Sequence, residues 1–342
     1  LNRRQKGWDT PSFDDASWAS VQVADTSLDN LTASVSPAVR VIETFKPVKI
    51  FTTPSGARVI DFGQNISGRE RVRLRGQRGD TVRIYHSEIL EKGEFFTRNL
   101  RKAKALSTYI LSGEGEEWLA PRFAFYGFRY IKVEGIDGEL NPEDFVAEAI
   151  SSATPENGTF VSSDSLINRL QSNIKWGMLD NFVDIPTDCP QRNERMGWAG
   201  DTHIFCHTAL NNSSLKKFYE RNLQAMRDLQ TPEGQYPEIA PVGGGFGGIT
   251  YECASIFMAW ELYEQYGDIR TLEKFYPGMQ KYMDYMKDKG LPGTKVNPAI
   301  GPLGDWLAPE ETDLLLLWNA FYYKEADLMS RIAGALGRTE EQ

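Results

Sequence analysis

The sequence predicts a multidomain chain in which a β-sandwich at 35–154 precedes a helical domain at 155–342 that resembles the first part of an (α/α)6 six-hairpin barrel. Three observations support this fold class. Short runs of alternating apolar and polar residues fill the first half, and an apolar repeat of four residues starts near residue 166. Long loops rich in glycine, proline, aromatic and acidic residues then separate the helical segments.

The first 34 residues are rich in turn-forming residues and contain two tryptophans, in "GWDTPSFDDASWASVQVAD", so we expect the end of a preceding β module or a linker. From residue 35, "ARVIDFGQNISGRERVRLRG" and "DTVRIYHSEIL" alternate apolar and polar residues, as half-buried strands do. "STYILSG", "FRYIKVEG" and "FVAEAIS" continue the pattern between Gly, Asp and Asn turns. Short strands at regular spacing favour a sandwich.

The polar cluster "TPENGTFVSSDS" marks the change to helices, because its Ser and Asp residues can cap the helix that follows. That helix has one apolar face, formed by Leu166, Leu170, Ile174, Met178 and Phe182. Further helical segments are predicted at about 214–229, 252–265, 271–288 and 312–335.

The connections between these segments, at 183–201, 231–250 and 289–311, are longer and more elaborate than a plain bundle needs. Elaborate loops at one end of antiparallel helices are typical of an α/α barrel. Only about five or six helices are predicted, whereas a closed six-hairpin barrel needs roughly a dozen. We therefore expect a barrel that is cut off part-way.

Composition excludes several functions. The formal net charge of −9 and the pI near 5.1 argue against nucleic-acid binding, which needs a basic surface. No apolar run reaches the ~18 residues of a membrane span. The three cysteines form neither a disulfide framework nor a zinc pattern. His203 and His207 could share a helix face, but no third ligand is nearby, so neither a metal nor a cofactor is expected. The oligomeric state, the localisation and the leaving group of a substrate stay open.

Residues 188–201 read "DCPQRNERMGWAGD" and combine acids, arginines and an indole. One carboxylate can accept hydroxyl hydrogen bonds while another, in a drier environment, holds a proton. Arg192 offers a planar set of donors and Trp198 offers an apolar wall. These are components of a glycosidase site. The same residues could equally form a salt-bridged loop that only ties two helices together.

Two further loops place an acid beside an aromatic residue. "VGGGFGGITYECA" contains Tyr251 and Glu252, and "IGPLGDWLAPEE" contains Asp305 and Trp306. Each loop alone is explained by a glycine-rich hinge or by an acid near a helix start. Three such loops in one domain favour a binding site.

The stretch "DCPQRNERMGWAGD", followed later by "GDWLAP", resembles the catalytic domain of bacterial α-L-rhamnosidases, glycoside hydrolase family 78. "IDFGQNISGRERVRLRGQRGDTVRIYHSEIL", "TRNLR" and "APRFAFYGFRYIKVEG" are similar to the β-sandwich that precedes the barrel in those enzymes. The resemblance covers essentially the whole chain, in the right order.

The resemblance implies hydrolysis of terminal α-L-rhamnose from a glycoside or polysaccharide, with inversion and without a cofactor in the chemistry. On matching positions Glu194 would be the general acid. Two acids and an arginine would hold the rhamnose hydroxyls, two indoles would wall its ring and methyl group, and the other two loops would complete the subsite. The expected sugar-binding residues are Asp188, Arg192, Trp198, Asp201, Tyr251, Glu252, Asp305 and Trp306.

Two departures from the family pattern affect this expectation. Asn193 stands where the family commonly has an acid, so a like-charge contribution to raising the pKa of Glu194 should be smaller. The loop that usually reads Trp-Gly/Ser-Asp is here Tyr251-Glu252-Cys253, and Glu252 would have to take over the acid role with a different reach.

An inverting glycosidase needs a second carboxylate, roughly 6.5–9.5 Å from the acid, as general base. The resemblance implies that this base lies beyond residue 342, and we expect Glu310, Glu311 and Asp313 to be helix-start residues instead. The chain would then carry the acid and not the base, and would be inactive alone. Two alternatives stay open: a carbohydrate-binding relative without catalysis, and a six-hairpin glycosidase acting on another sugar.

Overall fold

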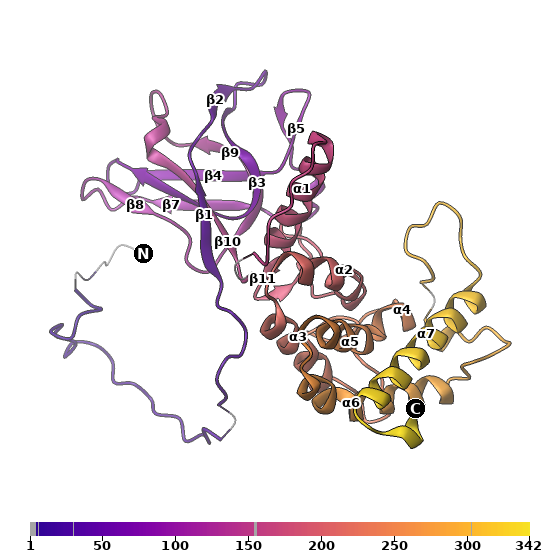
Figure 1. Cartoon of the computed structure of the whole chain (residues 1–342). Coiled ribbons are helices and arrows are strands. Elements are labelled where there is room, and N and C mark those ends of the chain that lie inside the picture. The colour runs from indigo at the N-terminus through magenta and orange to yellow at the C-terminus, as the bar shows by residue number, and fades with distance from the viewer. Residues whose placement is uncertain (1–4, 6, 30, 154–155, 302) are drawn as a thin grey trace.

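The structure is a computed structural model that describes residues 5, 7–29, 31–153, 156–301 and 303–342. A β domain and an α-helical domain follow one another along the chain (Figure 1). The predicted order of the two fold types is confirmed. The domain boundary expected at 154 and 155 lies outside the described residues.

The β domain contains ten strands within the described residues, and all of its pairings are antiparallel. Eight of them form one sheet in the order β1-β10-β3-β9-β4-β7, with β2 and β8 paired to further parts of β3. The strands are β1 (Arg40–Phe45), β2 (Lys49–Thr52), β3 (Arg58–Leu74), β4 (Thr81–Ser87), β5 (Leu90–Glu91), β6 (Glu94–Phe95), β7 (Leu106–Ile110), β8 (Glu117–Leu119), β9 (Tyr126–Glu134) and β10 (Phe145–Ser151).

The long strand β3 explains why this domain is one curled sheet rather than two separately bonded sheets. Its 17 residues pair with β2 near the first end, with β10 and β8 near the second end, and with β9 at both Val59–Asp61 and Ile66–Gly68. The register of β3 against β9 shifts between Asp61 and Ile66, and such irregularities bend a strand. The alternating residues of the strands meet in one apolar core, which includes Ile60, Ile66, Val72, Ile84, Phe128 and Ile131.

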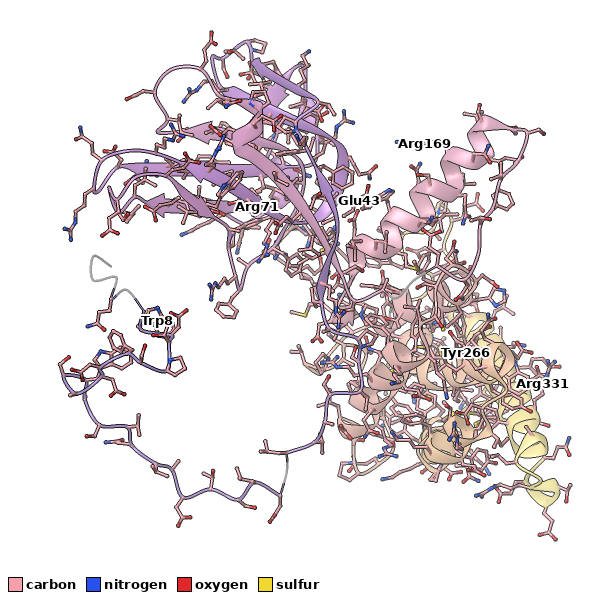
Figure 2. The ribbon with its side chains drawn as sticks, turned by 60° about the vertical axis from the view of Figure 1, so that its left-hand side comes forward. Trp8, Glu43, Arg71, Arg169, Tyr266 and Arg331 are labelled. Carbon is pink, nitrogen blue, oxygen red and sulfur yellow. The ribbon has the colours of Figure 1, made fainter. Side chains whose placement is uncertain are left out.

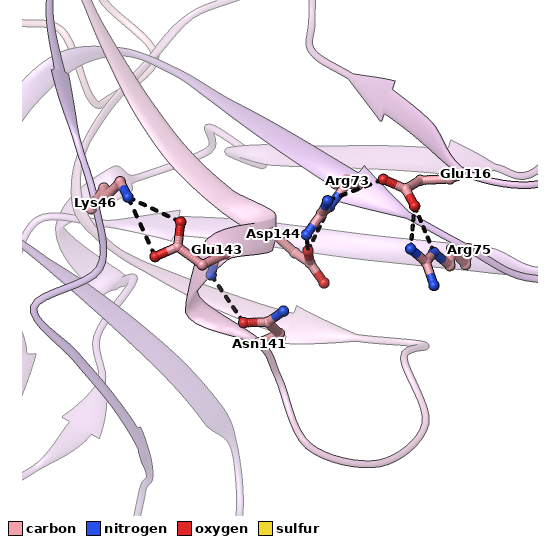
Figure 3. Close-up of polar contacts among 7 residues, drawn as sticks. All are labelled: Lys46, Arg73, Arg75, Glu116, Asn141, Glu143 and Asp144. Carbon is pink, nitrogen blue, oxygen red and sulfur yellow. Dashed lines mark hydrogen bonds and ion pairs between the residues drawn. The ribbon is translucent and has the colours of Figure 1, made fainter.

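Ion pairs tie strand ends of the β domain together (Figure 3). Arg73 Nε donates to Asp144 Oδ1 over 2.7 Å, and Arg75 Nε donates to Glu116 Oε2 over 2.9 Å. Lys46 Nζ lies 2.9 Å from Glu143 Oε2. The Lys46–Glu143 and Arg75–Glu116 pairs are exposed and contribute little each, whereas the Arg73–Asp144 pair is partly buried. Arg73 and Arg75, at the end of β3, are thereby joined to the short 3-10 helix η2 (Pro142–Asp144) and to the loop before β8, and Lys46 joins the β1–β2 connection to η2.

The helical domain contains seven α-helices within the described residues. They are α1 (Ser165–Asn181), α2 (Ala199–Asn212), α3 (Lys216–Asp228), α4 (Ile249–Glu252), α5 (Ala254–Tyr266), α6 (Ile269–Asp288) and α7 (Leu314–Ala335). A short hairpin, β11 (Phe182–Val183) with β12 (Ile185–Pro186), follows α1. Short 3-10 helices are η1 (Arg98–Leu100), η3 (Pro298–Ile300) and η4 (Thr339–Glu341).

All five predicted helical segments are found, and two helices were not predicted: α2 and the single turn α4. The composition of α2 explains its omission, because Gly200, Thr202, Cys206 and two asparagines are weak helix formers. Residues on several sides of α2 are buried, so it lacks the clean apolar stripe of a surface helix. The predicted loop 183–201 therefore contains the β11–β12 hairpin and ends where α2 begins at Ala199.

The apolar face predicted for α1 is buried only in its second half. Met178 and Phe182 join the core of the helical domain, whereas Leu166 is 78% and Leu170 is 58% exposed. The first turns of α1 extend beyond the other helices, as the outward-pointing Arg169 illustrates (Figure 2). Asp164 caps this helix by accepting a hydrogen bond from the Leu166 backbone, as the polar cluster before it predicted.

The described part of the first 34 residues contains no strand. It forms an extended arc outside both domains that curves back below the β domain, with Trp8 near its free end (Figure 2). None of the described helices combines the length and the apolar character that crossing a membrane requires.

Candidate active site

One cavity of about 990 Å³ opens between α1, α2, α7 and the loops of the helical domain. Eight of the nine expected site residues line it, although they come from three separate loops. They are Asp188, Arg192, Glu194, Trp198, Asp201, Tyr251, Asp305 and Trp306. The ninth, Glu252, does not line it.

The loop at 188–198 is closed by a pair of backbone and side-chain contacts. The Asp188 backbone N–H donates to Met196 O over 2.9 Å, and the Met196 N–H donates to Asp188 Oδ1 over 2.7 Å. Arg192 bridges two acids: it donates to Asp188 Oδ2 and to Glu194 Oε2, each over 2.9 Å. The side chains that form the salt bridges of this loop are therefore the same ones that line the cavity.

Glu194 is held by three donors. Besides Arg192, Arg101 of the β domain donates to Oε2 over 2.9 Å, and the Trp198 indole N–H donates to Oε1 over 3.1 Å. Burial alone would raise the pKa of Glu194, but the hydrogen bonds from Arg192 and Trp198 and the charges of both arginines lower it. In this arrangement Glu194 is a carboxylate and a hydrogen-bond acceptor.

Asp201 lies in the first turn of α2, and its pKa is shifted in the opposite direction to that of Glu194. Burial of its carboxyl raises its pKa, and the negative charges of Asp188 and Glu194 raise it further. Asp201 therefore holds a proton more readily than Glu194 does. Among the acids of the cavity, Glu194 is thus paired with cations that lower its pKa, whereas burial and neighbouring charges raise the pKa of Asp201.

Aromatic rings form the wall beside the acids. The Trp198 ring meets Tyr251 and Phe246 edge-on, with ring centroids 5.5 and 5.2 Å apart. Gly200 and Gly247 lie against the Tyr251 ring, where an added Cβ would come within 2.6 and 2.2 Å of ring carbons. The glycines of "GWAGD" and "GFGG" therefore let Tyr251 reach the cavity.

Glu252 points into the protein instead. Its Oε1 accepts from Gln235 Nε2 over 2.6 Å, and Oε2 has no partner among the described residues. Burial raises its pKa to about 8, and the charge of Glu238 adds to this. Tyr251 and Glu252 are neighbours on the helical turn α4, so when Tyr251 faces the cavity, Glu252 faces the core. From this position the Glu252 carboxyl does not line the cavity, unlike the eight other expected residues.

Glu238, which was not predicted from the sequence, shapes the glycine-rich loop. Its buried carboxylate accepts hydrogen bonds from the backbone N–H groups of Gly247 and Gly248, the second over 2.8 Å. Its backbone carbonyl accepts from Ala199 N–H over 2.7 Å, at the start of α2. The glycine run was visible in the sequence, but nothing local indicated which acid would bind its amides.

The third loop places an exposed indole at the mouth of the cavity. Asp305 accepts hydrogen bonds from the Thr312 hydroxyl over 2.6 Å and from the Thr312 N–H over 3.2 Å, and these lower its pKa. Trp306 follows, with 59% of its surface exposed. Asp305 thus closes its own loop and thereby holds Trp306 in place. Asp313 caps α7 as expected, accepting from Leu316 N–H over 2.9 Å.

The candidate metal ligands contact other partners. Oxygen and sulfur atoms of Asp188, Cys189 and Glu194 lie within 4.8 Å of one another, but Arg192 already binds both carboxylates. His203 Nε2 lies 2.9 Å from Thr250 O, whereas His207 Nδ1 lies 2.7 Å from Glu261 Oε2.

A β domain joined to a helical domain, with carboxylates, arginines and indoles around one cavity, has the architecture of a glycosidase with a helical catalytic domain. Comparison with protein families specifies it further. The bacterial alpha-L-rhamnosidase 6 hairpin glycosidase domain matches residues 155–342, and the bacterial alpha-L-rhamnosidase concanavalin-like domain matches residues 51–151. The chain therefore belongs to the bacterial α-L-rhamnosidase family.

Individual relatives agree with this assignment. The chain is 36% identical to an α-L-rhamnosidase of Streptomyces avermitilis over 337 residues, which are 97% of this chain and 32% of that protein. A structure of that organism's α-L-rhamnosidase complexed with L-rhamnose has a TM-score of 0.91 at 36% identity, covering 97% of this chain and 33% of the other.

An α-L-rhamnosidase structure from Dictyoglumus thermophilum also has a TM-score of 0.91, at 33% identity over 99% of this chain and 39% of the other. The chain thus spans about a third of the length of the curated relatives that it matches.

Proposed function

We propose that this chain forms part of a glycoside hydrolase that removes terminal α-L-rhamnose from glycosides or polysaccharides. The observation that carries the proposal is the convergence of Asp188, Arg192, Glu194, Trp198 and Asp201 on one cavity. Family membership supports it, as does the L-rhamnose bound in a relative of 36% identity. Rhamnose has hydroxyls for the acids and an apolar methyl group for the indoles, which suits a cavity with both kinds of wall.

In the proposed inverting mechanism Glu194 donates a proton to the glycosidic oxygen while the bond from that oxygen to the anomeric carbon breaks. A base-activated water attacks from the opposite face of the sugar. Because Arg101, Arg192 and Trp198 stabilise the ionised form of Glu194, one of these donors must move away as substrate binds. Asp201, whose pKa is raised by burial and by the charges of Asp188 and Glu194, is the competing candidate for the proton donor.

We assign no general base among the described residues. Glu310 and Glu311 are exposed and do not line the cavity, and Asp313 caps a helix. We therefore propose that the base is supplied by a part of the protein outside these 342 residues, consistent with a six-hairpin barrel of which this chain forms the first part. The coverage of only about a third of the relatives' length supports this view.

Hydrolysis of aryl α-L-rhamnosides tests the proposal, using the protein in its longest natural form and the present chain beside it. Glu194→Gln should nearly abolish turnover when the leaving group is poor and lose much less when it is an activated nitrophenol, since protonation then matters less. Asp201→Asn should weaken binding of both substrates equally. If Asp201→Asn instead shows the leaving-group dependence, the acid role moves to Asp201.

Two outcomes would favour the alternatives. Calorimetric binding of L-rhamnose with no turnover in the longest form would indicate a carbohydrate-binding protein without catalysis. Turnover of a different sugar in a panel of aryl glycosides would indicate another glycosidase specificity. Inversion itself is checked by proton NMR, which should show β-L-rhamnose as the first product.

A further inference from the structure

The stretch "TRNLR" of the β domain has no role in the site as expected from sequence, yet its last residue enters the cavity. Arg101 follows the 3-10 helix η1 (Arg98–Leu100) in a left-handed conformation with φ of +56°. Leu100 is buried beside it and anchors the turn. This conformation directs the guanidinium at the helical domain, where it lines the cavity and reaches Glu194 over 2.9 Å.

The two domains hold this contact in register through a second hydrogen bond. The Lys102 N–H donates to Asn193 Oδ1 over 3.0 Å, immediately beside the Arg101–Glu194 pair. Asn193, which departs from the family pattern, thus joins the Glu194 loop to the β domain. The amide oxygen makes this contact without placing another negative charge beside Glu194.

Two further contacts clamp the same loop. Arg195 donates to the Phe125 carbonyl over 2.9 Å and lies over its ring, 4.7 Å from the centroid. Gly127 of β9 packs directly on Gln191, where an added Cβ would come within 2.8 Å of the Gln191 Cβ. The loop that carries Glu194 is therefore positioned by the β domain on both sides of Glu194.

The two arginines that contact Glu194 differ in their other partners and in their exposure to solvent. Arg192 is shared with Asp188, and the titratable groups Asp201 and Cys189 lie beside the same acids. Among the described residues, the ion pair formed by Arg101 is with Glu194, and 59% of the Arg101 side chain is exposed against 27% for Arg192. Of the two arginines that contact Glu194, Arg101 is thus the more exposed to solvent and to a ligand in the cavity.

We propose that Arg101 is a positioning residue, supplied by the β domain, that fixes the Glu194 carboxylate in the cavity and balances its charge until substrate binds. The inference rests on the proposed function of Glu194. It makes the β domain part of the active site and predicts that removing Arg101 leaves Glu194 freer and easier to protonate.

The test compares Arg101→Gln with Arg101→Lys and with Arg98→Gln. Arg98 belongs to the same stretch and pairs with Glu91 on the surface, so its substitution is a matched control. Titration of 13C-labelled glutamate carboxyls by NMR, with Glu194 assigned from the Glu194→Gln variant, reports the protonation of Glu194 without requiring activity. Loss of one charge at hydrogen-bond distance should raise the Glu194 midpoint by about 0.5–1 pH unit, with Arg101→Lys restoring most of the shift and Arg98→Gln showing none.

An unchanged midpoint in a folded Arg101→Gln protein would overturn the inference. Should the glutamine variant not fold, Arg101→Met, which keeps an apolar stem of similar length, is titrated in its place with the same expected shift. In the longest natural form, the basic limb of the kcat/KM profile for an aryl rhamnoside should move upward by the same amount. A shifted carboxyl midpoint in a protein that neither binds nor hydrolyses rhamnosides would support the pairing of Arg101 with Glu194 and would overturn the proposed function instead.

Discussion

Glu252 offers the sharpest test of how a buried acid affects the stability of this domain as the pH changes. The side chain is almost fully buried, and it accepts one hydrogen bond, from Gln235. Burial raises its pKa from the ordinary 4.5 to about 8. Glu252→Gln imitates the neutral carboxyl, since it keeps the oxygen that accepts from Gln235 and has nearly the same shape.

The sign of the pH effect follows from proton binding. Between pH 4.5 and about 8 the folded protein keeps the Glu252 proton and the unfolded chain has lost it, so the free energy of unfolding falls as pH rises through this window. Each pH unit corresponds to about 1.4 kcal/mol, which gives an upper limit of roughly 5 kcal/mol across the window. Glu252→Gln removes this dependence. We therefore expect the variant to match the wild type near pH 4.5 and to be more stable by several kcal/mol at pH 9.

Urea unfolding followed by far-UV circular dichroism at several pH values measures the difference, and Glu310→Gln is the control because Glu310 is exposed. L-Rhamnose affinity should not change in Glu252→Gln, because this side chain does not line the cavity. Equal destabilisation by Glu252→Gln at pH 5 and pH 9 would refute the reasoning. A large loss of rhamnose affinity would instead return Glu252 to the sugar site.

Two further changes test the seam between the domains. Gly127→Ala should destabilise the protein by about 1–3 kcal/mol and weaken rhamnose binding, because the added Cβ would overlap Gln191. Gly158 lies in open space, so Gly158→Ala should change neither the stability measured by thermal unfolding nor the affinity measured by calorimetry. Asp180→Asn should flatten the fall in stability between pH 4 and 7, because burial and the charge of Glu88 raise the pKa of Asp180 to about 7; an unaltered pH slope in thermal unfolding would contradict this.

The order of the domains and most helices could be predicted from sequence because their signals are local. Alternation at period two and the four-residue repeat after Asp164 depend only on neighbouring residues. Local sequence patterns did not predict the elements whose burial comes from contacts with residues distant in the sequence. Helix α2 is enclosed by other elements, so its residues show little periodicity. The continuity of the β sheet depends on several partners of β3, which no local pattern reveals.

The residues of the site also divide into those that local sequence patterns predicted and those that depend on distant contacts. Acids and aromatic residues close in sequence predicted three loops that converge on one cavity, and the structure brings eight of nine residues there. The missed contributions, Glu238 and Arg101, lie in other segments and act through contacts that no local pattern marks. The orientation of Glu252 was also not predictable, because one position along α4 decides whether a side chain faces the cavity or the core.

The pairing of Glu194 also indicates which contact must change for catalysis. In its proposed role as general acid, Glu194 needs a proton at the moment the glycosidic bond breaks, yet the free site stabilises its carboxylate. Arg192 is mostly buried and bonded to Asp188 as well, so moving it would leave Asp188 without its cation. Arg101 is the more exposed donor and can return to water at lower cost. We therefore expect substrate to exchange the Arg101 contact rather than that of Arg192, which links proton uptake at Glu194 to occupancy of the cavity beside the β domain.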